Sequence, residues 1–80
     1  MSRAGDVVSV VARQLATKPD AVQVTEYERR GTTVVELMMA PGELGRVIGR
    51  QGRTAAALRT LASAAAELEG VRASVDFRDE

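Results

Sequence analysis

The stretch from Leu44 to Leu61 constrains the fold of this chain more than any other. Apolar residues recur at helical spacing on both sides of a four-residue segment that contains two glycines, Gly49-Arg50-Gln51-Gly52. These apolar residues are Leu44, Val47 and Ile48 before the segment, and Ala55, Leu58, Leu61, Ala62, Ala65 and Leu68 after it. The pattern predicts two helices, over residues 42–48 and 53–67, that each bury one face and are joined by a short glycine loop.

The remaining segments predict one more helix and three strands. Helical spacing indicates a helix over residues 6–17, capped by Asp6 or Ser2 and ended by Pro19, and we expect residues 1–5 to be frayed. Alternating apolar and polar residues indicate strands over residues 21–28, 33–40 and 71–78, with a hairpin turn at residues 29–32. The alternation slips at Tyr27, which indicates either a bulge or a side chain on the outer face.

The order of these elements, α-β-β-α-α-β, predicts an α+β fold. The second strand is apolar on both faces, which is typical of a central strand. It is connected to the third strand through a helical crossover, so these two strands should be parallel, whereas the first two form an antiparallel hairpin. We therefore predict a single domain over residues 1–80, with a mixed three-stranded sheet and three helices packed on one face.

The chemistry of the glycine loop favours anion binding. Gly49 lies where the first helix must stop and a positive φ is preferred, and Gly52 lies at the start of the next helix, where a missing side chain lets another backbone come close. The first amides of a helix lack internal partners and carry partial positive charge. Flanking guanidinium groups can reach phosphate oxygens, and an amide side chain can bond a base edge or a sugar hydroxyl. The guanidinium groups are those of Arg46, Arg50 and Arg53, and the amide is that of Gln51. No acidic residue falls between Leu44 and Ala66.

The run Val47-Ile48-Gly49-Arg50-Gln51-Gly52-Arg53-Thr54 resembles the signature of KH domains, an Ile-Gly-x-x-Gly loop between two helices. The element order resembles the type II, prokaryotic form of that fold. Length, the Pro-Asp after the first helix and the Ala-Pro before the short helix make the chain similar to the KhpA family of small bacterial single-KH proteins.

This resemblance implies binding of single-stranded RNA, with about four nucleotides held across the loop. The site residues that it implies are Arg46, Ile48, Gly49, Arg50, Gln51, Gly52, Arg53 and Thr54, with Ile48 in an aliphatic groove floor. It also implies a small RNA-binding regulatory protein that pairs with itself or with a larger partner containing KH and R3H domains.

Composition argues against several other classes of protein. Eleven basic residues balance eleven acidic ones, which argues against a broad non-specific nucleic-acid binder but not against a local basic patch. The chain has no cysteine or histidine, so we expect no thiolate or zinc site and no cofactor. It has no long apolar run and no secretory signal, so we expect a cytoplasmic protein without a membrane segment. No catalytic motif is present, so we expect no enzyme.

The main alternative is a protein-interaction module. A core this small can gain stability from association. Met38, Met39, Val34 and the alanine-rich helix are candidates for a contact surface, although most of these residues also suit an ordinary core.

Overall fold

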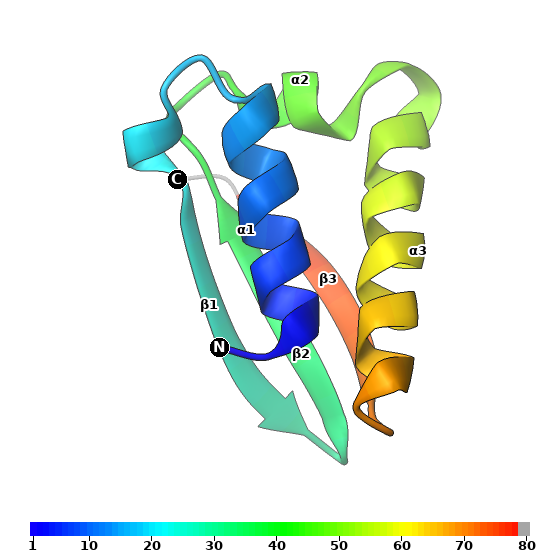
Figure 1. Cartoon of the computed structure of the whole chain (residues 1–80). Coiled ribbons are helices and arrows are strands. Elements are labelled where there is room, and N and C mark those ends of the chain that lie inside the picture. Colours follow the sequence, from blue (N-terminus) through cyan, green and yellow to red (C-terminus); the bar gives the residue numbers. More distant parts are fainter. Residues whose placement is uncertain (79–80) are drawn as a thin grey trace.

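The computed structural model describes residues 1–78, and for Arg50 it describes the backbone alone. Its elements are α1 (Arg3–Leu15), β1 (Gln23–Arg29), β2 (Thr32–Met38), α2 (Leu44–Ile48), α3 (Arg53–Leu68) and β3 (Arg72–Arg78), with short 3₁₀ turns at Pro19–Ala21 and Arg50–Gly52. Helices α1 and α3 lie side by side over one face of the sheet, and α2 lies at one end of this layer (Figure 1). This arrangement confirms the predicted α+β fold, although residues 79 and 80 of the predicted domain lie outside the described part.

The sheet has the order β1-β2-β3, with β2 in the centre. β1 pairs with β2 in antiparallel fashion and β3 pairs with β2 in parallel, as predicted. On the helix side of β2, Val35 and Leu37 are fully buried, and on the open side Val34 is also buried. Burial on both faces is what an apolar central strand requires.

The hairpin between β1 and β2 turns on two residues. Arg30 and Gly31 both have positive φ, 52° and 80°, which is the geometry of a type I′ turn. Pairing runs without interruption from Gln23↔Met38 to Arg29↔Thr32. Of the two alternatives for Tyr27, the bulge is therefore absent, and the second one holds: Tyr27, opposite Val34, lies on the open face.

The core fills the space between the sheet and the helices. Its members are Ala4, Val8 and Ala12 of α1, Val22, Val35, Leu37 and Met39, Val47 of α2, Leu58, Ala62 and Ala66 of α3, and Val75 of β3. Small alanines on α3 let the helix approach its neighbours closely. Because Met39 is 3% exposed and Val34 is 5% exposed, neither can serve as the contact surface considered from the sequence.

The expectation that residues 1–5 are frayed is wrong. α1 begins at Arg3 because Ser2 caps it, accepting a hydrogen bond from the Gly5 amide at 3.1 Å. The Glu26 carboxylate on β1 in turn accepts hydrogen bonds from the Ser2 amide at 3.0 Å and the Ser2 hydroxyl at 2.9 Å. A carboxylate also favours the positive end of a helix, so this contact fixes the start of α1.

Several predicted boundaries also differ by one or two residues. α1 ends at Leu15 instead of residue 17, β1 begins at Gln23 instead of residue 21, and β2 ends at Met38 instead of residue 40. α2 begins at Leu44 because the preceding residues, 41–43, form a turn in which Gly42 has a φ of 84°. Terminal turns of this kind are the part of an element that periodicity defines least.

Candidate nucleic-acid interface

The loop between α2 and α3 is a tight turn built on its two glycines. α2 ends where the Gly49 amide donates to the Gly45 carbonyl at 3.0 Å, and the turn closes where the Gly52 amide donates to the Gly49 carbonyl at 3.2 Å. Gly49 and Gly52 have φ values of 78° and 71°, which confirms the positive φ predicted for Gly49. Gln51 between them is also left-handed, with a φ of 60°.

The two glycines differ in what surrounds them. A Cβ atom on Gly49 would lie 2.5 Å from the Thr54 hydroxyl oxygen and 3.0 Å from the Thr54 Cβ, so the loop folds back tightly against the first turn of α3. A Cβ atom on Gly52 would meet no atom within 4 Å. The loop is therefore closed toward the protein at Gly49 and open toward solvent at Gly52.

The open side of the loop coincides with the amino-terminal end of α3. Gly52 is the N-cap residue, and no side chain accepts a hydrogen bond from the first turn there. The first amides of an α-helix have no partner inside the helix, and the helix dipole adds partial positive charge at this end. Since α3 extends over Arg53–Leu68, this end has the character of a binding site for an anion.

The predicted site residues lie on the loop and on the helix turns that flank it in α2 and α3. Arg46 and Arg53 are exposed, and the Arg53 guanidinium donates to the Gln51 side-chain oxygen at 3.1 Å, which ties two of the predicted side chains together. Ile48, the last residue of α2, is half-buried. Thr54 packs against Gly49, as described above, and the side chain of Arg50 lies outside what the structure describes. The structure thus brings these residues together, and their contacts with RNA stay a prediction.

The carboxylate of Glu43 anchors the start of α2 through hydrogen bonds that the sequence did not predict. Its carboxylate, 5% exposed, accepts hydrogen bonds from the Thr17 hydroxyl, from the Thr17 amide at 2.6 Å and from the Lys18 amide at 3.2 Å. These hydrogen bonds, above all the one from the Thr17 hydroxyl, lower the pKa of Glu43, and the charge of Arg46 acts in the same direction. A helix as short as α2 has little stability of its own, so this carboxylate helps to position the loop that follows it.

The lowered pKa of Glu43 predicts a specific dependence of stability on pH. In the unfolded chain the pKa of Glu43 has its ordinary value of about 4.3. The ionised carboxylate therefore makes its full contribution to the free energy of unfolding above that pH, and the contribution is lost as pH falls through the lower pKa of the folded state. In Glu43→Gln this component is missing. We expect the variant to melt below the native protein at about pH 7 and the gap to narrow by about pH 3. Thermal unfolding followed by circular dichroism measures the gap, and a gap independent of pH would contradict the role of the charge.

A second feature that the sequence did not predict lies further along α3. The Arg59 guanidinium stacks over the ring of Phe77 on β3, with Cζ 5.0 Å from the ring centroid. Arg59 is also part of the wall of a surface hollow of about 440 Å³ together with Thr60, Ser63, Ala64 and Glu67. With a rise of about 1.5 Å per residue, Arg59 lies roughly 9 Å beyond Arg53 on the helix.

Comparison with known proteins identifies the family. A family model described as "KhpA/KhpB, KH domain" matches residues 5–77. The chain belongs to this KhpA/KhpB family of KH domains. The RNA-binding protein KhpA of Aquifex aeolicus is 45% identical over 77 residues, covering 96% of this chain and 98% of the relative. The RNA-binding protein KhpA of Caldanaerobacter subterraneus is 44% identical over 73 residues, covering 91% and 97%. The predicted relation to KhpA is thereby confirmed.

The fold also matches part of a larger solved protein. Era of Aquifex aeolicus superposes with a TM-score of 0.65 at 19% sequence identity, over 95% of this chain and 29% of the Era chain. A structure of Era in complex with nucleotides 1506–1542 of 16S ribosomal RNA matches equally well. At this level of identity the likeness concerns the fold alone.

Within residues 1–78, no helix has the length and apolar character that a membrane span requires. No group of three or more acidic, histidine or cysteine side chains in the same residues lies close enough together to hold a metal ion.

Proposed function

We propose that the chain binds single-stranded RNA and holds the sugar-phosphate backbone of about four nucleotides at the Gly49–Gly52 loop. The observation that carries this proposal is the open side of Gly52 at the uncapped start of α3. There the missing side chain of Gly52 leaves space for a phosphate to approach the backbone amides. Glu43 is the acidic residue nearest to the Gly49–Gly52 loop in the sequence. It is buried, and its carboxylate accepts hydrogen bonds from residues 17 and 18.

Each residue around the loop has a role in this proposal that follows from its chemistry. Arg46, Arg50 and Arg53 neutralise phosphates, and Gln51 bonds a base edge or a ribose hydroxyl. Ile48 supplies an apolar contact below the bases, and the outer face of the Arg59 guanidinium stacks on a base that leaves the loop. None of these groups is a nucleophile with a neighbouring base, so the proposed activity is binding without cleavage, and it requires no cofactor.

The comparisons support this function because the relatives that match over most of their length are named as RNA-binding proteins. By extension from them, we propose a small regulatory RNA-binding protein of the cytoplasm.

A phosphate clamp makes the affinity depend on salt. If three or four phosphates are neutralised, the logarithm of the binding constant for a short single-stranded RNA should fall with the logarithm of salt concentration with a slope of roughly −2 to −3. Fluorescence anisotropy between about 50 and 200 mM salt measures this slope. An affinity that does not change with ionic strength would rule out the clamp.

A second candidate function, association with another KH-containing chain, is favoured by the outer surface of the helix layer. Val10 on α1 is 61% exposed, and Leu61 and Leu68 on α3 are 47% and 74% exposed. Leu61 and Leu68 are seven residues apart and so share one face of α3. α1 and α3 are neighbours in the helix layer (Figure 1), so both helices of this layer have exposed apolar side chains that pairing would remove from water. We propose that a second copy of this chain, or the KH domain of a larger relative, covers these side chains.

Replacing Leu61 with glutamate tests this pairing. We expect Leu61→Glu to weaken self-association by at least about tenfold, because a charged group would enter an apolar interface. Thr60→Glu is the matched control, since Thr60 is also exposed on α3 but is part of the wall of the hollow near Arg59. Sedimentation equilibrium measures both. A native protein that remains monomeric, or a Leu61→Glu variant that associates normally, would contradict the proposal.

A further inference from the structure

On the open face of the sheet, basic and acidic side chains are unevenly distributed along the strands. The strand register aligns residues of β1, β2 and β3 in rows across this face. The row nearest the hairpin contains Arg29, Thr32 and Arg72, and the next row contains Tyr27, Val34 and Ser74. These two rows contain two guanidinium groups, three hydroxyl groups, one of them on the aromatic ring of Tyr27, and no carboxylate.

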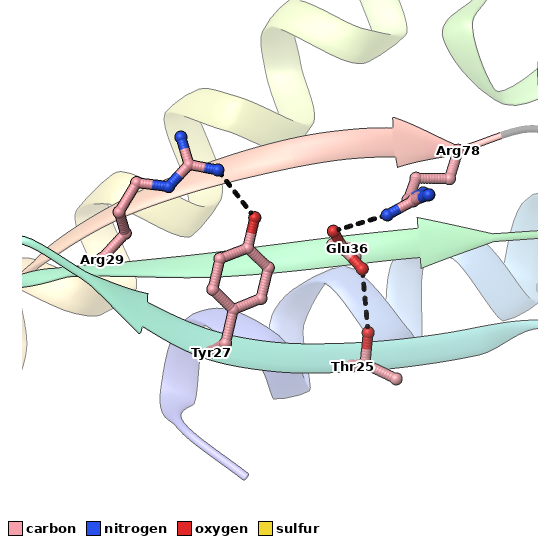
Figure 2. A network of polar contacts seen from close by, with 5 residues as sticks. All are labelled: Thr25, Tyr27, Arg29, Glu36 and Arg78. Carbon is pink, nitrogen blue, oxygen red and sulfur yellow. Dashed lines mark hydrogen bonds and ion pairs between the residues drawn. The ribbon is translucent and has the colours of Figure 1, made fainter.

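The carboxylates of this face lie in the third row, which contains Thr25, Glu36 and Asp76. Figure 2 shows the contacts of the Glu36 carboxylate, which accepts hydrogen bonds from Arg78 at 3.1 Å and from Thr25 at 3.4 Å. Arg78–Glu36 is the single ion pair found within the described residues, so neither Arg29 nor Arg72 is neutralised by a carboxylate there. The hairpin end of the face is therefore basic in a chain with no net charge.

The ring of Tyr27 organises this end of the face. The Arg29 guanidinium donates to the Tyr27 hydroxyl at 3.1 Å and lies 5.8 Å from the ring centroid (Figure 2). Tyr27 is 38% exposed, so part of its ring remains open to a partner. An arginine next to an exposed aromatic ring offers a phosphate contact and a stacking surface for a base at the same place.

We propose that the patch formed by Tyr27, Arg29, Thr32, Arg72 and Ser74 is a second contact site for single-stranded RNA. Arg29 and Arg72 lie two strands apart, so their backbones are about 10 Å apart, and their long side chains can converge on one phosphate or hold neighbouring ones. The Tyr27 ring stacks on a base, with no requirement for a particular base. This inference rests on the proposed RNA binding at the Gly49–Gly52 loop, because the patch extends that site.

The distance between the two sites sets the length of RNA that can use both. α3 begins at the loop and ends just before β3, and its length over Arg53–Leu68 is about 24 Å. Arg72 at the start of β3 also belongs to the wall of a hollow of about 290 Å³ between α3 and β3, with Ser63, Glu67, Val71 and Ala73. An RNA that fills only the loop ends well short of the patch. A longer strand can follow the α3–β3 side of the molecule and reach it.

The test measures how tightly the native protein and the variant Arg29→Gln/Arg72→Gln bind two poly-uridine strands, one of about five and one of about twenty nucleotides. We expect the dissociation constant for the long strand to rise about tenfold, with a salt slope smaller by roughly 1.4 because two phosphate contacts are lost. The affinity for the short strand should stay within about twofold. Arg3→Gln is the control for loss of charge, since Arg3 is exposed on α1 and not on the sheet.

Tyr27→Leu removes the stacking surface. It should weaken the affinity for the long strand alone by about threefold to tenfold.

The outcomes separate the two proposals. If the native protein binds both strands and Arg29→Gln/Arg72→Gln binds the long strand as tightly as before, the patch is not an RNA site. Equal weakening of both strands would also overturn the inference. If the native protein binds neither strand, the proposed function fails, and the second site fails with it.

Discussion

Gly49→Ala should be among the most destabilising single substitutions in this chain. The backbone of Gly49, with φ of 78° and ψ of 171°, lies in a region that is essentially restricted to glycine. The added methyl group would also lie 2.5 Å from the Thr54 hydroxyl oxygen. Backbone strain of about 1–3 kcal/mol and overpacking of about 1–3 kcal/mol act together. We expect the melting temperature to fall by on the order of 15 °C.

Gly52→Ala is the matched control, because its φ of 71° is also left-handed but its new methyl group meets no atom within 4 Å. We expect a loss of only about 1–2 kcal/mol. The folded variant should nevertheless bind RNA more weakly, because the methyl group occupies the space through which a phosphate approaches the amides. Equal melting temperatures for the two variants would show that the contact between Gly49 and Thr54 does not hold the loop in place.

Most of the fold could be predicted from the sequence because its signals are local or periodic. The central position of β2 follows from apolar residues on both of its faces, such as Val34 and Val35. Its parallel pairing with β3 follows from the helical crossover between them. Glycine positions predicted the turn between α2 and α3, since glycine adopts a positive φ without the steric clash that a side chain would cause.

The sequence left Ser2 and Asp6 as alternative caps for α1, because the contact that fixes Ser2 as the cap comes from a distant residue. Ser2 alone is a plausible cap, but the carboxylate that fixes it comes from Glu26, 24 positions later on β1. A second distant carboxylate, that of Glu69, accepts a hydrogen bond from the Arg3 amide at 3.1 Å. Contacts of this kind exist only once the sheet and the helices have packed together.

The same limit applies to the site. The glycines and arginines of the loop are contiguous in sequence, so their gathering could be predicted. No local pattern indicates the role of Glu43, because its carboxylate accepts hydrogen bonds from Thr17 and Lys18, which lie far away in the sequence. The pairing of Arg59 with Phe77 depends on how α3 lies over β3. The buried carboxylate and the stacked arginine are therefore the additions that the structure makes to the predicted site.

The second large effect is expected from two substitutions at the tip of the loop, Arg50→Asp/Gln51→Asp. These positions lie between Gly49 and Gly52, where Gln51 is exposed, so the fold should tolerate the change. The substitutions place two carboxylates beside the amides that are proposed to bind a phosphate. A hydrogen bond to a charged group contributes about 1.5–3 kcal/mol, and repulsion adds to its loss, so the dissociation constant for RNA should rise by on the order of 100-fold.

The most direct test of the loop as an RNA clamp is therefore one comparison: the affinity of the native protein and of Arg50→Asp/Gln51→Asp for the same short single-stranded RNA, measured beside their melting curves. The clamp predicts a loss of affinity on the order of 100-fold with melting temperatures that agree within a few degrees. Unchanged RNA affinity in a folded variant would contradict it and would leave association with another chain as the better account of this protein.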